Sequence, residues 1–148
     1  MLSEKQKSLI GFANDQGTVS LSVGVIRSGK SYAAAIGFML HTQRLEDPYT
    51  HLILGKKLRV LETELLPTMQ EMAANIGAGY RYSRSDQILN IGDQKYIVAA
   101  GNDERSQDRV QGITAHSAII DEATLVPEGF WQAAVSRMTY QDLSLIHI

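Results

Sequence analysis

The stretch GVIRSGKS, residues 24–31, fits the pattern G-x-x-x-x-G-K-[ST] that is typical of a phosphate-binding loop. Glycine at positions 24 and 29 lets backbone N–H groups turn toward an anion, because glycine reaches positive φ at little cost. Lys30 would reach the β- and γ-phosphates of a nucleotide, and the Ser31 hydroxyl would ligate Mg²⁺. The alternative is an ordinary turn between a strand and a helix that carries a lysine by chance.

The flanks of this loop have the pattern that the motif requires. Residues 18–23, TVSLSV, alternate apolar and small polar side chains, which predicts a β-strand. Residues 32–44, YAAAIGFMLHTQR, are rich in alanine and apolar on one side, which predicts a helix. A strand, a glycine loop and a helix in this order favour an anion site at the helix N-terminus, where unpaired N–H groups attract phosphate.

The composition is that of one globular domain. The chain has 148 residues, of which 44% are hydrophobic and 20% charged, and its net charge is -2. Any contact with nucleic acid must therefore come from a local basic patch or from parts of the protein outside this sequence. The absence of cysteine excludes disulfides and thiolate metal sites. No apolar run approaches the ~20 residues of a membrane span, and residues 1–7 lack the apolar core of a signal peptide, so we expect a cytoplasmic protein with no membrane contact.

The rest of the chain predicts strands that alternate with helices. Helices are expected at 3–12 and 56–76, and strands at 51–55, 80–83, 87–91, 95–100 and 116–120. The predicted fold class is α/β, a P-loop NTPase with a mostly parallel sheet flanked by helices. The strands at 87–91 and 95–100 would form an antiparallel hairpin at the edge of that sheet, because a Gly-Asp turn separates them.

Three later stretches carry more specific expectations. Pro67 cannot donate a helical hydrogen bond, so we expect a break or kink at Leu66. Residues 102–112 predict either a charged loop or a short helix. Pro127 would begin a last helix. Its core-facing residues would be Phe130, Trp131, Ala134 and Val135.

Residues 117–122, SAIIDE, place two carboxylates directly after an apolar stretch. Open α/β sheets bind ligands at the carboxyl ends of their strands. Asp121 would hold Mg²⁺, mostly through water molecules, and Glu122 would polarise the attacking water as a general base. Solvated charges at a strand end are the alternative, and the upstream phosphate-binding loop favours the catalytic interpretation.

Three arginines are candidates for contact with the nucleotide. Arg27 lies inside the loop motif, where its guanidinium would sit near the γ-phosphate. Arg105 or Arg109 would act as an arginine finger, in the same or in a neighbouring subunit. Each of the three is otherwise a solvated surface residue. The histidines show no metal-ligand spacing, so we expect structural roles for all four (His41, His51, His116 and His147).

Over nearly its whole length the sequence resembles the large subunits of tailed-phage terminases. The loop with its internal arginine carries this resemblance, together with ERSQDRVQGIT (104–114), which leads into IIDEA (119–123). The segment LSEKQ (2–6) is similar to the N-terminal segment of that family. The resemblance implies an ATP-driven DNA-packaging motor with ATP and Mg²⁺ as cofactors. It also implies double-stranded DNA, a portal, a small terminase subunit and further copies of the chain as partners.

Site residues follow from the resemblance position by position. Catalytic roles fall on Glu122, Arg27 and Lys30. Nucleotide contacts fall on Gln6, at the adenine, and on Gly24, Arg27, Ser28, Gly29, Lys30 and Ser31. Metal contacts fall on Ser31 and Asp121. The coupling motif and the nuclease domain of the family would follow these residues, so no nuclease residue is assigned. Another P-loop DNA motor, such as a helicase or a recombinase-like ATPase, and a module that binds nucleotide without turnover are the alternatives.

The last six residues, LSLIHI (143–148), can be encoded by CTG TCT CTT ATA CAC ATC. This string matches the transposon mosaic end used in sequencing libraries. We therefore expect residues 1–142 to be part of a P-loop ATPase domain and residues 143–148 to be adaptor read-through. Leu145 and Ile146 would then lack evolved partners and lie exposed or disordered.

Overall fold

The structure, a computed structural model, describes residues 19–21, 30–121, 126–136 and 144–147. The strands in this part are β1 (Val19–Leu21), β2 (Thr50–Gly55), β3 (Tyr80–Ser83), β4 (Ile88–Ile91), β5 (Gln94–Ala100), β6 (Ser117–Ile120) and β7 (Ser144–His147). The helices are α2 (Lys30–Gln43), α3 (Leu58–Val60), the π-helix η2 (Leu61–Leu65), α4 (Leu66–Asn75), α5 (Glu104–Gln111) and α6 (Glu128–Ser136). The expected boundaries in this part agree within two residues, and the helix expected at 3–12 lies outside it.

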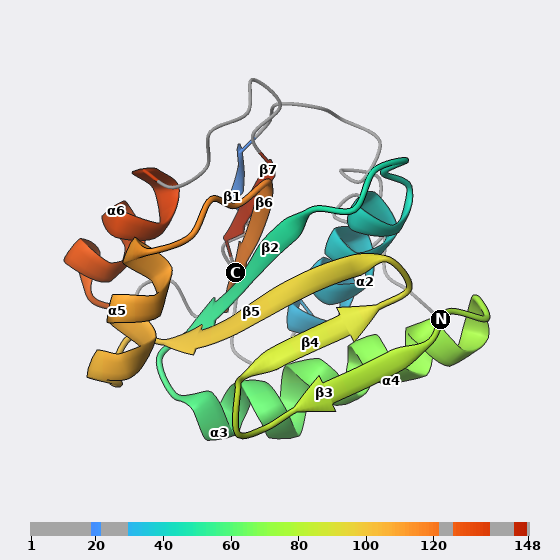
Figure 1. Cartoon of the computed structure of the whole chain (residues 1–148), viewed down its shortest axis with the longest axis horizontal. Coiled ribbons are helices and arrows are strands. Elements are labelled where there is room, and N and C mark those ends of the chain that lie inside the picture. The colour runs from blue at the N-terminus through green and yellow to red at the C-terminus, as the bar shows by residue number, and fades with distance from the viewer. Residues whose placement is uncertain (1–18, 22–29, 122–125, 137–143, 148) are drawn as a thin grey trace.

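The described strands form one sheet in the order β1-β7-β6-β2-β5-β4-β3 (Figure 1). The pairings from β1 through β7, β6 and β2 to β5 are parallel. β4 and β3 continue the sheet as an antiparallel edge. The predicted α/β fold, with a mostly parallel sheet and an antiparallel edge hairpin, is therefore confirmed.

Helices cover both faces of the sheet. On one face α2, η2 and α4 pack against Ile53, Tyr96 and Ile119. On the other face α5 and α6 pack against Leu52 and Ile120, and Figure 1 shows these two helices on the opposite side of the sheet from α2. Because β2 is buried on both faces, its sequence is a continuous apolar run rather than an alternating one.

The helix at 58–75 is irregular at the place where proline predicts a break. Leu61–Leu65 forms a π-helical turn, and the N–H of Leu66 donates to the carbonyl of Leu61. Pro67, which cannot donate to a carbonyl of the preceding turn, follows as the second residue of α4. The predicted irregularity at Leu66 is thus a widened turn inside one continuous helix.

The structure shows the turn between β4 and β5 and the form of the charged segment at 102–112. Gly92 and Asp93 form the two-residue loop between β4 and β5, and Gly92 takes a φ of 56° that suits a glycine. The charged segment is a helix, α5, and Asp103 caps it by accepting the N–H of Arg105 at 3.1 Å. In α6, Phe130 and Ala134 are buried as expected, whereas the side chains of Trp131 and Val135 lie outside the described part.

The backbone of residues 144–147 is paired in the sheet, whereas the exposure of the Leu145 and Ile146 side chains lies outside the described part. Ser144–His147 forms β7, whose backbone pairs in parallel with β1 on one side and with β6 on the other. The backbones of Leu145 and Ile146 therefore have partners within the sheet. The adaptor origin of residues 143–148 stays a prediction, and resequencing the source DNA past Gln141 without transposase tests it.

Candidate functional site

The carboxyl ends of the parallel strands are aligned at one edge of the sheet. Leu21 at the end of β1 is in register with His147, and His147 is in register with Ile120 at the end of β6. Ile120 is in turn paired with Leu54 near the end of β2. β1 and β6 are two strands apart, so their ends lie about 10 Å from each other. This edge is where parallel α/β sheets bind ligands.

The helix that follows β1 begins at Lys30. Lys30 and Ser31 thus form the first turn of α2, the place expected for the end of a phosphate-binding loop. α2 is fixed to the sheet by Ala34, Ala35 and Phe38, which are fully buried. The alanine-rich sequence allows this close packing, because small side chains let a helix approach the strands.

Asp121 is the predicted metal ligand that the structure places at this edge. It directly follows β6, and its N–H donates to the carbonyl of Leu54 at 2.8 Å. The residue is only 6% exposed. The structure therefore brings Asp121 and the start of α2 to the same edge of the sheet. The remaining predicted residues lie outside the described part (Gln6, Gly24, Arg27, Ser28, Gly29 and Glu122).

The same edge carries residues that the sequence reasoning did not assign. The N–H of Gly101 donates to the carbonyl of Gly55 at 2.9 Å, and that of Asn102 donates to the carbonyl of Lys56 at 3.3 Å. Lys56 and Lys57 are exposed directly after β2. The available signal was the basic run KKLR immediately after a buried apolar strand, which the helical pattern of residues 56–76 obscured.

The two candidate finger arginines on α5 differ in their surroundings. Nη1 of Arg109 donates to Oε1 of Gln87 at 2.7 Å, and Nη2 donates to the carbonyl of the same residue at 3.3 Å. Burial lowers the pKa of the Arg109 guanidinium. Gln87 lies in the turn between β3 and β4 with a φ of 56°. Arg109 thus connects α5 to this turn, while Arg105 is exposed.

The opposite, amino edge of the sheet holds three of the histidines. The ring of His116 lies 5.7 Å from that of His51 and 6.2 Å from that of His41, measured between centroids. Nε2 of His51 contacts Oε1 of Gln94 at 2.8 Å. Burial lowers the pKa of His51 from 6.5 to about 3, although the hydrogen bond with Gln94 opposes that shift. These three histidines are buried parts of the packing, as expected.

Most of the chain matches one known protein family. The family model for the terminase large subunit, T4likevirus-type, N-terminal, matches residues 22–145. The chain belongs to the terminase large subunit family. No curated protein sequence matches it. In the residues that the structure describes, no helix of this terminase domain is long and apolar enough to cross a membrane.

Solved structures share the fold of this terminase domain. The large terminase of a thermophilic bacteriophage is 25% identical and superimposes with a TM-score of 0.89, over 99% of this chain and 38% of that one. The large terminase ATPase domain of Thermus phage P74-26 is 15% identical, with a TM-score of 0.66 over 98% of this chain and 68% of that one. The HK97 bacteriophage large terminase is 13% identical, with a TM-score of 0.73 over 99% of this chain and 33% of that one. The chain thus spans well under half the length of the first of these proteins.

Proposed function

We propose that this terminase domain binds and hydrolyses ATP at the carboxyl edge of its sheet, and that the reaction drives DNA into a phage capsid. The observation that carries the proposal is the common edge of α2, which begins at Lys30, and β6, which ends before the buried Asp121. The large terminase of the thermophilic bacteriophage, which shares this fold, has been solved in complex with ADP and with ATP-gamma-S. The nucleotide of those complexes supports the same ligand here.

The reaction is phosphoryl transfer to water, in which positioning and charge stabilisation do most of the work. Residues 24–31, with Gly24, Ser28 and Gly29, would surround the phosphates through backbone N–H groups, and Gln6 would contact the adenine. Lys30 and Arg27 would stabilise charge on the γ-phosphate. Glu122 would take the proton of the attacking water.

Mg²⁺ is the metal that fits the residues present. The carboxylate of Asp121 and the hydroxyl of Ser31 are hard oxygen donors of the kind that Mg²⁺ prefers. Asp121 is buried, and the hydrogen bond from its N–H to the carbonyl of Leu54 holds its backbone beside the end of β2. When bound, Mg²⁺ would neutralise charge on the transferred phosphate.

The partners of the motor are part of the proposal. Double-stranded DNA would be its substrate, and the portal and the small terminase subunit would anchor it in the packaging machine. Several copies of the chain would assemble around the DNA, in the cytoplasm of the infected host. Arg105, exposed on α5, would then be available to a neighbouring copy.

Nucleotide binding and turnover by matched variants test the proposal. We expect Lys30→Ala to weaken binding of a fluorescent ATP analogue by tenfold or more, because it removes a charge from the phosphates. We expect Glu122→Gln to keep that binding and to slow single-turnover hydrolysis by about 10²-fold or more. Lys95→Ala, on an exposed residue of β5 at the amino edge, should change neither quantity.

Two results would contradict the proposal in different ways. Unchanged binding in Lys30→Ala would exclude the phosphate-binding loop. Binding by the full-length protein without any hydrolysis, and with no difference in Glu122→Gln, would leave a nucleotide-binding module in place of an ATPase.

A further inference from the structure

We propose that Lys56, Lys57 and Arg59, which we call the basic corner, form a contact surface for the phosphate backbone of duplex DNA. This inference rests on the proposed function and names the surface by which the motor contacts its substrate. Lys56 and Lys57 connect β2 to the helix at 58–75, and Arg59 is the second residue of that helix. All three are exposed.

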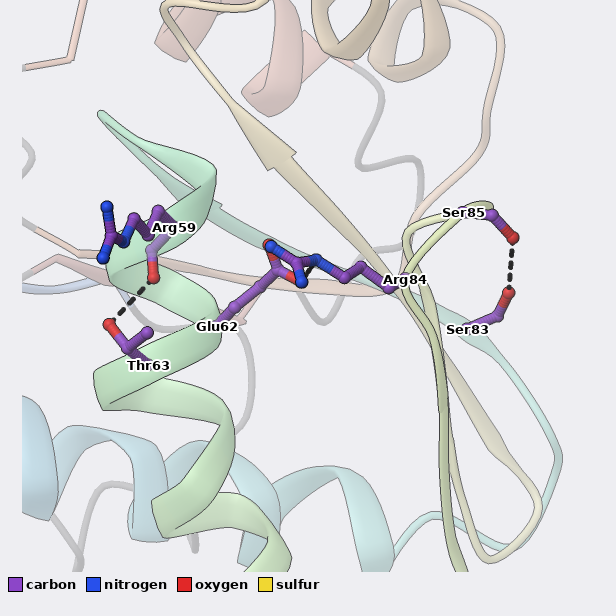
Figure 2. A network of polar contacts seen from close by, with 6 residues as sticks. All are labelled: Arg59, Glu62, Thr63, Ser83, Arg84 and Ser85. Atoms are coloured by element: carbon purple, nitrogen blue, oxygen red, sulfur yellow. Dashed lines mark hydrogen bonds and ion pairs between the residues drawn. The ribbon is translucent and has the colours of Figure 1, made fainter.

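In the part of the chain that the structure describes, no carboxylate forms an ion pair with the basic corner. Glu62, the nearest acidic residue along the helix, is only 12% exposed, and its Oε2 lies 3.3 Å from Nε of Arg84. In Figure 2, Arg84 reaches from the β3–β4 turn toward Glu62, while the guanidinium of Arg59 extends away from this pair. The negative charge of Glu62 is therefore matched by Arg84 rather than by the corner.

The acidic residue that follows β5 is also engaged elsewhere. Asn102 contacts the backbone of Lys56, and the next residue, Asp103, caps α5. Its two carboxylate oxygens accept from the N–H of Arg105 at 3.1 Å and from Oγ of Ser106 at 3.2 Å. The corner thus stays a local positive surface on a chain whose net charge is -2. Exposed, unpaired cations of this kind neutralise DNA phosphates and release counterions.

The position of the corner links it to the nucleotide site. β2 is the direct neighbour of β6, and the carbonyl of Leu54 accepts the N–H of Asp121 at 2.8 Å. Only Gly55 separates that residue from Lys56. A movement of the catalytic edge during hydrolysis would therefore reach the corner through two residues of backbone.

The salt dependence of DNA binding, measured on variants that each lose one positive charge, tests the proposal. The probe is a labelled, random-sequence DNA duplex, followed by fluorescence anisotropy with this chain at several salt concentrations. We expect Lys57→Gln and Arg59→Gln each to reduce the slope of log K against log salt by about 0.9, the value for one lost phosphate contact. The double variant should lose about 1.8 in slope and roughly tenfold or more in affinity at physiological salt.

The control is Lys95→Gln, which removes one exposed cation from the amino edge of the sheet. It should leave both the slope and the affinity unchanged. An unchanged slope in the double variant, an equal loss in Lys95→Gln, or no salt-dependent DNA binding by the parent chain would overturn the proposal.

Binding of a fluorescent ATP analogue, measured on the same variants, separates this inference from the proposed function. We expect Lys57→Gln and Arg59→Gln to bind the analogue like the parent. If the parent binds DNA through the basic corner but does not bind nucleotide, the proposed ATPase function is excluded and the proposed DNA contact is retained. If nucleotide binding is intact and the double variant binds DNA like the parent, only the corner is excluded.

Discussion

The two sides of the sheet are built in different ways. On one side β3, β4 and β5 follow one another along the chain within residues 80–100, and β5 pairs with β2 over six residues. On the other side β1 and β7 come from opposite ends of the chain, and their pairing spans only three residues. In the described part β1 has β7 as its one strand neighbour. The proposed nucleotide site thus lies on the side that long-range pairing completes, and the other side is formed by strands that are close together in the sequence.

The largest expected effect is a loss of stability when the pairing of β7 is disrupted. Leu145→Pro removes a backbone donor from a strand that is paired on both sides, with Val19 and with Ala118. We expect the free energy of unfolding to fall by about 3 kcal/mol or more, and β1 to lose its protection from hydrogen exchange. Urea denaturation and amide exchange measure the two effects.

Leu145→Val is the matched control, because valine preserves the strand backbone. It should keep β1 protected. If Leu145→Pro has the same free energy of unfolding as the parent, β7 does not hold β1 in the sheet. Long-range pairing would then not be what completes this side of the sheet.

The next prediction concerns the junction between β2 and the helix at 58–75. A Cβ at Gly55 would lie 2.8 Å from Cδ2 of Leu61. Gly55→Ala should therefore destabilise the domain by about 1–3 kcal/mol and displace the helix that carries the basic corner. Thermal unfolding monitored by circular dichroism checks the cost.

A matched glycine sharpens the test. Around Gly79 a Cβ would meet nothing within 4 Å, so Gly79→Ala should be close to neutral. If Gly55→Ala and Gly79→Ala lose the same free energy of unfolding, the close contact with Leu61 is not the cause of the loss at Gly55.

The third prediction uses the buried histidines of the amino edge. Because the pKa of His51 is lowered to about 3, the unfolded chain binds a proton below pH 6.5 that the folded chain does not bind until about pH 3. Stability is therefore complete above pH 6.5 and is lost as the pH falls toward 3. Between pH 7 and pH 5 this one group should lower the free energy of unfolding by about 2 kcal/mol.

Urea denaturation across this pH range measures the effect. His51→Leu should reduce the pH dependence by about one proton between pH 6 and pH 5. If the stability of His51→Leu depends on pH as that of the parent does, groups other than His51 cause the loss of stability at low pH.

The smallest expected effect lies in the contact between α5 and the β3–β4 turn. Arg109→Lys keeps the charge but loses the two-point contact with Gln87, so we expect a cost of about 1 kcal/mol. Arg105→Lys, on an exposed residue of the same helix, should stay within about 0.5 kcal/mol of the parent. Equal values for both would show that the contact with Gln87 contributes nothing measurable to stability.

The same contrast explains what could be predicted from the sequence. The hairpin of β4 and β5, the buried strand β2 and the helix after the glycine loop follow from local patterns and turn chemistry, and their boundaries were close. The place of Ser144–His147 between β1 and β6 depends on pairing across almost the whole chain, which no local pattern encodes. The position of the basic corner could not be predicted for a related reason, since only the sheet order brings β2, which ends just before Lys56, next to β6, which ends just before Asp121.

The central claim is that nucleotide binds where α2 begins and β6 ends. The most direct measurement is a titration of the isotopically labelled chain with ATP and Mg²⁺, followed by the chemical shifts of its backbone amides. The account predicts saturable shifts at residues 24–31 and around Asp121, with the amides of Lys95 and His116 at the amino edge unmoved. Saturable shifts confined to the amino edge, or no saturable shifts at all, would contradict it.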